Sequence, residues 1–152
     1  MDVIVKILSI FIMATIKCFE DLEIWKLARQ QVLEIWNLSQ IGTLLKDYGL
    51  KDQINRATGS VMDNIAEGFE RFSTKEFIQY LVIAKGSNGE VRSQLLRAFD
   101  RKHIDGNCLQ ENLSNSELIG KKISAFITYL QSSSYKSKLK PPTSNIQPPT
   151  VL

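Results

Sequence analysis

The chain has 152 residues, of which 43% are hydrophobic, a size that suits one domain with a single core and gives no sign of a second domain. Leu, Ile, Lys, Gln and Glu are abundant and all four prolines follow residue 131, so the composition favours an all-α protein over one with a sheet. The formal net charge of +3 equals the three lysines near the C-terminus, so the rest of the chain is neutral and overall charge gives almost no support for nucleic-acid binding.

The N-terminal segment from Val3 to Ala14 is strongly apolar, and only Lys6 and Ser9 interrupt it. It is too short to span a bilayer, and it lacks the basic start and the small-residue cleavage site of a signal peptide. Residues 1–15 are therefore an apolar N-terminal extension with two interpretations. Either residues 1–12 lie upstream of a native start at Met13, or the segment is an apolar arm that packs on the domain or touches a membrane.

Two amphipathic segments predict the first two helices. The first is expected from about Phe19 to Ser39, with acidic residues at its start that suit the positive end of the helix dipole. Its expected core residues are Leu22, Trp25, Ala28 or Arg29, Val32, and Ile35 or Trp36. After a connection that contains Gly42, the second helix is expected from Leu50 to Phe69. Its expected core residues are Ile54, Ala57 or Thr58, Val61, Ile65 and Phe69.

The third and fourth helices each follow a capping-box pattern, a serine with a glutamate three residues later. Ser73 and Glu76 start the third helix, which is expected to reach Lys102, and Ser114 and Glu117 start the fourth. The third helix has apolar or small residues in a heptad rhythm: Phe77, Leu81, Ala84, Asn88, Val91, Leu95 and Ala98. The fourth repeats the rhythm with Ile119, Ile123, Phe126 and Leu130. Short connections make neighbouring helices antiparallel, so residues 16–131 are predicted to form an up-down-up-down four-helix bundle.

Residues 132–152 hold all the prolines and have almost no periodicity, so they are predicted to be a disordered tail. Lys136, Lys138 and Lys140 lie in this tail. They either scan an anionic partner or are simply solvated.

A second apolar surface is predicted on the third helix, away from its heptad positions. Ile78, Val82 and Leu96 lie there, and small residues accompany them: Gly86, Ser87, Gly89 and Ser93. Glycine inside a helix costs about 1 kcal/mol relative to alanine, so we expect close approach of another backbone to compensate. The first helix likewise spreads apolar residues beyond one stripe, namely Ile24, Leu27 and Leu38. We therefore expect the protein to self-associate.

No constellation of side chains predicts catalysis, a metal site or a cofactor. Cys18 and Cys108 lack zinc-binding spacing, and as free thiols they suit the cytoplasm. The sole histidine, His103, has no nucleophilic partner and is interpreted as a cap at the end of the third helix. Glu67 is interpreted as a solvated residue or as an ion-pair partner of Arg71, not as a general acid.

Basic residues of the third helix are the strongest candidates for a binding site. Lys85 and Arg92 are seven residues apart and therefore nearly aligned, while Arg97 and Arg101 share another face that Lys102 extends. Such groups can neutralise phosphates, and repetition in a symmetric oligomer would multiply the patch. The alternative is an ordinary solvated face, balanced by two acidic neighbours, Glu90 and Asp100.

Four blocks in chain order resemble one protein family: FEDLEIWKLAR at 19–29, YGLKDQINRA at 48–57, NIAEGFERFSTKEF at 64–77 and IAKGSNGE at 83–90. From about residue 16 to 131 the chain resembles the bacterial four-helix-bundle family of 23S rRNA intervening-sequence proteins, related to the accessory variability protein of diversity-generating retroelements. The resemblance implies a homopentameric barrel with a basic surface that contacts nucleic acid and, for the retroelement relatives, contact with a reverse transcriptase. It implies mainly structural roles for Asn64, Glu67, Gly68, Gly86, Ser87 and Glu90. One departure is Cys18, where the family often has serine, and a thiol weakens the first helix cap.

The leading hypothesis is a non-enzymatic, oligomeric, cytoplasmic protein that binds structured RNA, or nucleic acid more broadly, through phosphate contacts. The residues expected to make these contacts are Arg56, Lys85, Arg92, Arg97, Arg101 and Lys102. The first alternative is a protein-protein adaptor that docks a polymerase, such as a reverse transcriptase, or a ribosome-associated factor. The second is a bundle anchored to membranes by residues 3–14. No cofactor is expected, and no membrane partner is expected under the leading hypothesis.

Overall fold

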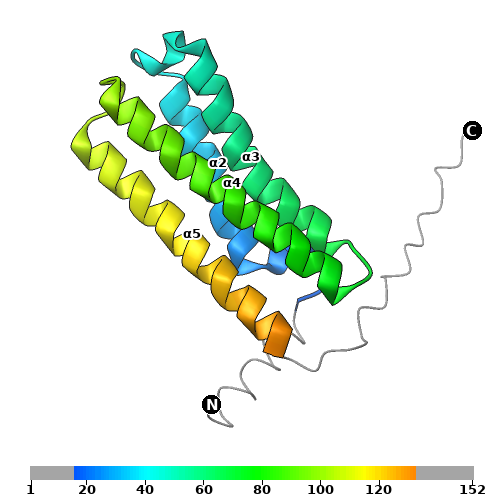
Figure 1. The fold of residues 1–152 in the computed structure, drawn as a ribbon. Helices are drawn as coiled ribbons and strands as arrows, with labels where there is room; N and C mark the ends of the chain where they lie inside the picture. Colours follow the sequence, from blue (N-terminus) through cyan, green and yellow to red (C-terminus); the bar gives the residue numbers. More distant parts are fainter. Residues whose placement is uncertain (1–15, 133–152) are drawn as a thin grey trace, which may run out of the picture.

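The computed structural model describes residues 16–132, in which the only regular elements are helices (Figure 1). In chain order these are η1 (Phe19–Asp21), α2 (Glu23–Ser39), η2 (Leu44–Lys46), α3 (Tyr48–Phe69), α4 (Thr74–Asp100) and α5 (Gly106–Ser132). The four α-helices run alternately up and down, and each packs on the next, with α5 closing the ring against α2. The predicted four-helix bundle is confirmed.

The bundle occupies the whole described range. Helix α5 continues to Ser132, one residue beyond the predicted end of the domain. The predicted N-terminal extension, 1–15, and the rest of the predicted tail lie outside the described residues. Between residues 16 and 132, no helix combines the length and the apolar character needed to cross a membrane.

Side-chain caps start α3 and α4. Asp47 Oδ1 accepts a hydrogen bond from the Leu50 N–H at 3.2 Å, and the Ser73 hydroxyl oxygen accepts one from the Glu76 N–H at 3.2 Å. Each cap satisfies a backbone donor that has no partner inside the helix. The serine cap of α4 is as predicted, but the Glu76 carboxylate accepts from the Ser73 hydroxyl at 2.7 Å instead of completing the capping box on the backbone.

Helix α4 ends at Asp100, short of the predicted end, because the chain turns sharply at Lys102. The φ angle of Lys102 is +60°, in the left-handed region. The His103 N–H donates to the Ala98 carbonyl at 2.9 Å and the Lys102 N–H to the Phe99 carbonyl at 2.8 Å, the paired bonds of a Schellman motif. Glycine usually occupies this position, so lysine carries a conformational cost there.

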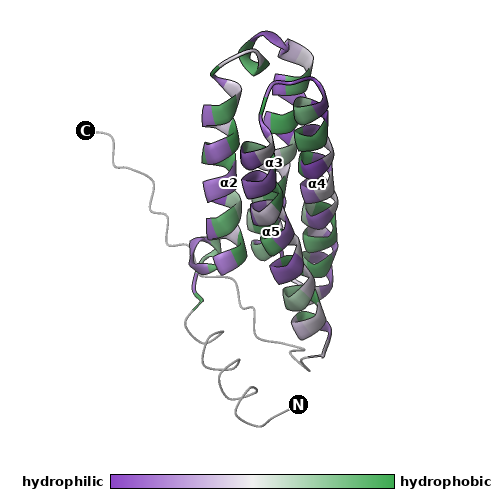
Figure 2. Ribbon diagram, turned by 90° about the vertical axis from the view of Figure 1, so that its left-hand side faces the viewer, coloured by the Kyte–Doolittle hydropathy of each residue, from purple (hydrophilic) through white to green (hydrophobic). Residues whose placement is uncertain are grey.

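The core lies between the four helices, and hydrophobic and hydrophilic residues alternate along each of them (Figure 2). All seven predicted heptad residues of α4 are buried, none more than 3% exposed. The predicted core residues of α3 and α5 are buried too, except Phe69 and Phe126, which are partly buried. Full burial of one Leu or Ile side chain stabilises the fold by about 1.5–3 kcal/mol, so these positions dominate the stability of the bundle.

The first predicted helix ends at Ser39 as expected, but its start and part of its buried face were wrong. The extended residue Leu22 separates η1 from α2. The buried residues of α2 are Ile24, Ala28, Gln31, Ile35 and Ser39. Leu22, Ala28 and Ile35 are confirmed as core residues, whereas Trp25 and Val32 are only partly buried. Trp36 is 53% exposed, and Trp25 is half-buried with its ring edge-on to Phe19, centroids 5.1 Å apart. An indole ring packs well at the edge of a core, where its N–H can stay hydrated, so the tryptophans do not mark the core face.

The predicted start of the fourth helix was also wrong. Helix α5 begins at Gly106, and the preceding Asp105 caps it by accepting from the Cys108 N–H at 2.8 Å. Ser114 lies inside the helix, where its hydroxyl donates to the Gln110 carbonyl at 2.8 Å. A serine can satisfy its hydroxyl inside a helix in this way, so a Ser-x-x-Glu spacing does not by itself mark a helix start.

Candidate nucleic-acid interface

Six cationic residues are predicted to contact nucleic acid, and the structure distributes them over more than one surface. Lys85 and Arg92 share an open cleft of about 600 Å³ between α4 and α5. We call it the α4–α5 cleft. Its lining residues are Lys85, Asn88, Gly89, Arg92, Ser116, Glu117, Gly120, Lys121 and Ser124.

Positive charge exceeds negative charge in the α4–α5 cleft. Lys85 and Arg92 come from α4 and Lys121 from α5, against one carboxylate, Glu117. The Arg92 guanidinium lies 3.4 Å from the Glu117 carboxylate, and both side chains are 48% exposed, so water screens this pair and it contributes little. No ion pair within residues 16–132 involves Lys85 or Lys121. These two ammonium groups are free to bind an anion.

Lys121 is not among the predicted contact residues. The sequence shows a pair of lysines, but successive residues of a helix point about 100° apart, so only one of the two can face α4. Lys122 points toward α2, where it pairs with Glu23 at 2.8 Å. The core face of α5 was predicted correctly, but which of its two flanks meets α4 and which meets α2 depends on the arrangement of the whole bundle, so the role of Lys121 could not be inferred.

Small residues keep the walls of the cleft open. A Cβ added to Gly89 would meet no atom within 4 Å, whereas one added to Gly120 would lie 3.2 Å from Asn88 Nδ2. The small residues predicted to form one strip on α4 therefore face different surroundings. Gly89 faces the cleft, while Ser87 is buried and its hydroxyl lies 2.8 Å from that of Ser60 on α3.

A buried polar layer lies beneath the cleft. The Nδ2 group of Asn88 donates to the Ser116 carbonyl at 2.7 Å, and the Nε2 group of Gln31 donates to the Ser116 hydroxyl at 2.6 Å. These residues are at most 3% exposed. Asn88 Oδ1 and Gln31 Oε1 accept no hydrogen bond from the described part of the chain. Buried amide oxygens almost always accept a hydrogen bond, so each of these two oxygens can accept one from a group outside the described chain.

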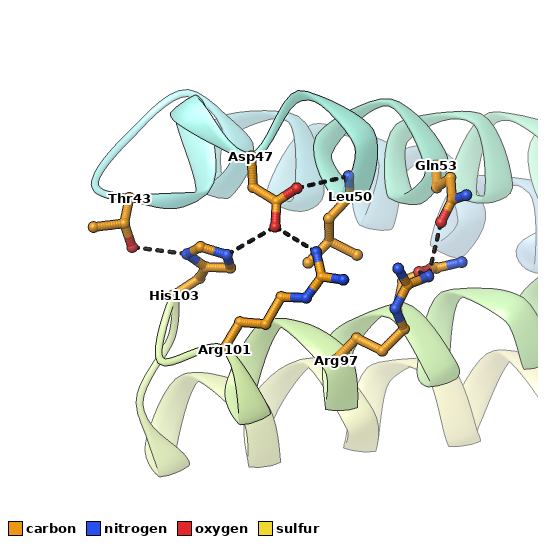
Figure 3. Close-up of polar contacts among 8 residues, drawn as sticks. Thr43, Asp47, Leu50, Gln53, Arg97, Arg101 and His103 are labelled. Atoms are coloured by element: carbon orange, nitrogen blue, oxygen red, sulfur yellow. Dashed lines mark hydrogen bonds and ion pairs between the residues drawn. The ribbon is translucent and has the colours of Figure 1, made fainter.

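Arg97 and Arg101 belong to a different surface, a polar network between the end of α4 and the start of α3 (Figure 3). Arg101 donates to the Asp47 carboxylate at 2.6 Å, and Arg97 donates to the side-chain oxygen of Gln53 at 2.8 Å. Both guanidinium groups thus hold α4 against α3. Their hydrogen bonds are directed at the protein itself, although the Arg101 side chain is 47% exposed.

The side chain of His103 joins this network. The prediction that it caps the end of α4 was therefore wrong. Its Nδ1 lies 2.8 Å from the Thr43 hydroxyl and its Nε2 lies 3.1 Å from Asp47. A carboxylate only accepts, so Nε2 carries a proton, and in the neutral ring Nδ1 accepts from Thr43. The hydrogen bond from Arg101, followed by that from the Leu50 N–H, lowers the pKa of Asp47 from 3.8 to about 2.

Arg56 and Lys102 stand apart from the cleft. Arg56, on α3, pairs with Asp52 at 3.4 Å, one turn away, and both side chains are largely exposed. Lys102 is the left-handed residue after α4. Neither lines the α4–α5 cleft, so the structure does not bring them to Lys85 and Arg92.

Several motif residues make side-chain contacts within α3 or between α3 and its neighbours. Asn64 Nδ2 donates to the Ser60 carbonyl at 2.7 Å. Glu67 accepts from the Tyr80 hydroxyl at 2.8 Å and forms the predicted ion pair with Arg71, one turn later. The hydrogen bond from Tyr80, followed by that from Arg71, lowers the pKa of Glu67 below its ordinary value. These contacts are structural, in keeping with the resemblance.

Gly68 lies at a close approach of α3 and α4. A Cβ at this position would lie 2.5 Å from Tyr80 Cβ and 2.9 Å from Phe77 Cδ2. Gly86 and Glu90 are exposed on α4, and a Cβ at Gly86 would meet no atom within 4 Å. Packing within one chain therefore explains Gly68 but not Gly86 or Glu90.

Comparisons with known proteins agree with this fold. No curated protein matches the chain. A crystal structure of a protein with unknown function from the S23 ribosomal protein family of Bacteroides thetaiotaomicron VPI-5482 is similar, with a TM-score of 0.63 and 20% identity. The match covers 68% of this chain and 97% of that chain, and at this identity it supports the fold alone. The family model of the 23S rRNA-intervening sequence protein matches residues 20–125. This chain therefore belongs to the 23S rRNA-intervening sequence protein family.

Proposed function

We propose that this protein is a non-catalytic oligomer that binds structured RNA through phosphate contacts in the α4–α5 cleft. The observation that carries the proposal is the charge of this cleft, where Lys85, Arg92 and Lys121 outnumber Glu117. The net charge of the chain before its tail is zero. Segregation of charge at the cleft supplies the positive surface that the overall composition does not.

The chemistry of the cleft suits phosphates better than bases. Ammonium and guanidinium groups form strong, charge-assisted hydrogen bonds with phosphate oxygens. The lining residues of the cleft include no aromatic side chain, so it offers no platform for base stacking. Side chains also do not enter the deep, narrow major groove of A-form RNA. Binding is therefore expected to follow the shape and phosphate positions of the RNA more than its sequence.

Self-association is the second part of the proposal, and α4 carries a surface for it. Val82 and Leu96 are two heptads apart on α4 and are 56% and 47% exposed. Gly86 and Ser93, also exposed, lie between them and would allow another helix to approach closely. The pentamer implied by the family resemblance would carry five clefts, so weak phosphate contacts would add up.

Charge reversal tests the RNA-binding proposal. Lys85→Glu and Lys121→Glu should each weaken binding of an RNA hairpin and reduce the slope of log affinity against log salt by about 1 or more. Arg56→Glu is the control, because it changes the net charge by the same amount at a residue that does not line the cleft. Fluorescence anisotropy measures the affinities. A salt-independent affinity between about 50 and 200 mM, or an equal loss with Arg56→Glu, would contradict the proposal.

Light scattering tests the assembly. The wild-type protein is expected to have the mass of an oligomer, and Leu96→Glu is expected to lower that mass because a buried, unpaired carboxylate is costly. Leu33→Glu, the same substitution at a 55% exposed leucine of α2, is the control for the introduced charge. A monomeric wild-type protein would contradict the oligomer.

An adaptor function is the second candidate, favoured by apolar residues at the connection between α2 and α3. Ile41 and Tyr48 are 64% and 79% exposed there. Exposed aromatic and aliphatic side chains suit a protein partner, such as a polymerase or a ribosome-associated factor. Pull-down after nuclease treatment separates the two functions, because a direct protein partner survives the nuclease and an RNA-bridged one does not.

A further inference from the structure

We infer that the α4–α5 cleft distinguishes RNA from DNA, because the Asn88 side-chain oxygen accepts a hydrogen bond from a ribose 2′-hydroxyl. The inference rests on the proposed function, since it concerns the sugar between phosphates held in the same cleft. The 2′-hydroxyl is the group by which a protein can tell RNA from DNA at a given site.

The Asn88 amide has an unused acceptor beside the cleft. Its Nδ2 group is engaged by the Ser116 carbonyl at 2.7 Å, while its Oδ1 atom is buried and accepts nothing from the described residues. An acceptor left unbonded in this way is destabilising. Asn88 is 3% exposed and lines the cleft, so a ligand in the cleft can reach its amide oxygen once this side chain shifts toward the cleft. A hydroxyl donor arriving there would complete the hydrogen bonds of the amide.

The position of Asn88 between two cations matches the order of groups in a nucleic-acid strand. Along the axis of α4, Asn88 is about 4.5 Å from Lys85 and about 6 Å from Arg92, at about 1.5 Å per residue. In a strand, every sugar lies between two phosphates. If successive phosphates contact Lys85 and Arg92, the sugar between them lies next to Asn88.

Gly89 leaves room for a sugar at this point, because a Cβ there would meet no atom within 4 Å. On the other wall, Gly120 packs closely against the Asn88 amide, and a Cβ there would lie 3.2 Å from Nδ2. A-form RNA has a wide, shallow minor groove that displays its 2′-hydroxyl groups. A helical region of RNA can therefore present a 2′-hydroxyl and the flanking phosphates to the cleft together.

Three hairpins of one sequence test the inference: RNA, DNA, and RNA with 2′-O-methyl groups, which cannot donate. The wild-type protein is expected to bind RNA about two- to tenfold more tightly than either of the others, the range for one net hydrogen bond. Asn88→Leu removes the acceptor with a side chain of similar size. We expect it to abolish the preference for RNA, so that the three hairpins bind with similar affinity.

Gln31→Leu is the matched control. Gln31 has the same kind of unbonded amide oxygen and also contacts Ser116, but it does not line the cleft. This variant is expected to keep the RNA preference. If Asn88→Leu does not fold, the affinities of the wild-type protein for the three hairpins still show whether it requires a 2′-hydroxyl donor.

Equal affinity of the wild-type protein for the three hairpins, or a preference that survives Asn88→Leu, would overturn the inference. The proposed function fails differently: no hairpin binds, or reversal of Lys85 and Lys121 leaves the affinities unchanged. Adenosine 5′-monophosphate distinguishes a strand from a free nucleotide. If it binds as tightly as the RNA hairpin, the assignment to an RNA strand is overturned.

Discussion

The guanidinium group of Arg101 lies 2.6 Å from the carboxylate of Asp47 and so joins the end of α4 to the start of α3. The same carboxylate caps α3 through the Leu50 N–H and accepts from His103, 3.1 Å away. One side chain therefore ties the connection between α2 and α3 to the connection between α4 and α5.

We predict that the bundle loses the stabilisation supplied by the charged Asp47 carboxylate as the pH falls from about 4 to about 2. The pKa of Asp47 is lowered from 3.8 to about 2, mainly by the hydrogen bond from Arg101. A carboxyl group with a lower pKa in the folded state contributes its full stabilisation above pH 3.8, and this contribution is lost as the pH falls through about 2. Asp47→Asn keeps a capping oxygen but no charge, so it should flatten this part of the pH profile. Urea unfolding at a series of pH values measures it.

Asp52→Asn is the control for this experiment. Asp52 also pairs with an arginine, Arg56, but both side chains are largely exposed, so the pair contributes little. Equal pH profiles for the two variants would show that Asp47 has no special role.

Gly68→Ala is expected to lower the free energy of unfolding by about 1–3 kcal/mol. Its new methyl group would meet Tyr80 and Phe77 of α4. Gly59→Ala, on the same helix, is the control, because a Cβ there meets no atom within 4 Å. The control should gain up to about 1 kcal/mol from the better helix propensity of alanine. A stable Gly68→Ala variant would contradict the close packing.

Gly89→Ala is expected to separate stability from RNA binding. The substitution should raise the free energy of unfolding by about 0.5–1 kcal/mol, because alanine favours the helix and its methyl group meets no atom. The same methyl group narrows the α4–α5 cleft, so RNA affinity should fall about two- to tenfold, as for one lost contact. Gly59→Ala should gain stability without losing affinity. Unchanged RNA binding by Gly89→Ala would argue against this cleft as the site.

Lys102→Gly is expected to stabilise the protein by about 1 kcal/mol without changing its affinity for RNA. Glycine adopts the left-handed φ of +60° without the cost that lysine bears. Lys102 does not line the α4–α5 cleft, so loss of its charge should have little effect there. Lys102→Ala removes the charge but keeps the backbone cost, and thermal unfolding of the two variants separates these effects. If both Lys102→Gly and Lys102→Ala lost much of their RNA affinity, Lys102 would contact the RNA after all.

The sequence predicted the long, regular helices best. The heptad of α4 from Phe77 to Ala98 is buried at every predicted position, because a long apolar stripe outweighs local preferences. Helix α2 was predicted less well, since its core face includes the polar residues Gln31 and Ser39 while Trp36 is exposed. A polar core residue is recognised only when its partner is known. Gln31 is bonded to Ser116, which is 85 residues away in the chain.

The candidate site was predicted in part. The seven-residue spacing of Lys85 and Arg92 placed them on one face of α4, because that relationship is local to one helix. Lys121 and Asn88 were not assigned to the site, since their positions depend on how α5 is rotated against α4. Conversely, Arg97 and Arg101 were assigned to it, but they are bonded to Gln53 and Asp47 from another helix and its cap.

By itself the sequence determined the four-helix bundle, its single core and the heptad face of α4, because helical periodicity and capping act over a few residues. The resemblance of four short blocks pointed to the family that the comparison then showed. Only the tertiary structure decided which basic side chains gather at one cleft, which are bonded within the protein, and which buried oxygen lacks a donor. These depend on the relative rotation and register of helices distant in sequence, and they result from packing of the whole bundle.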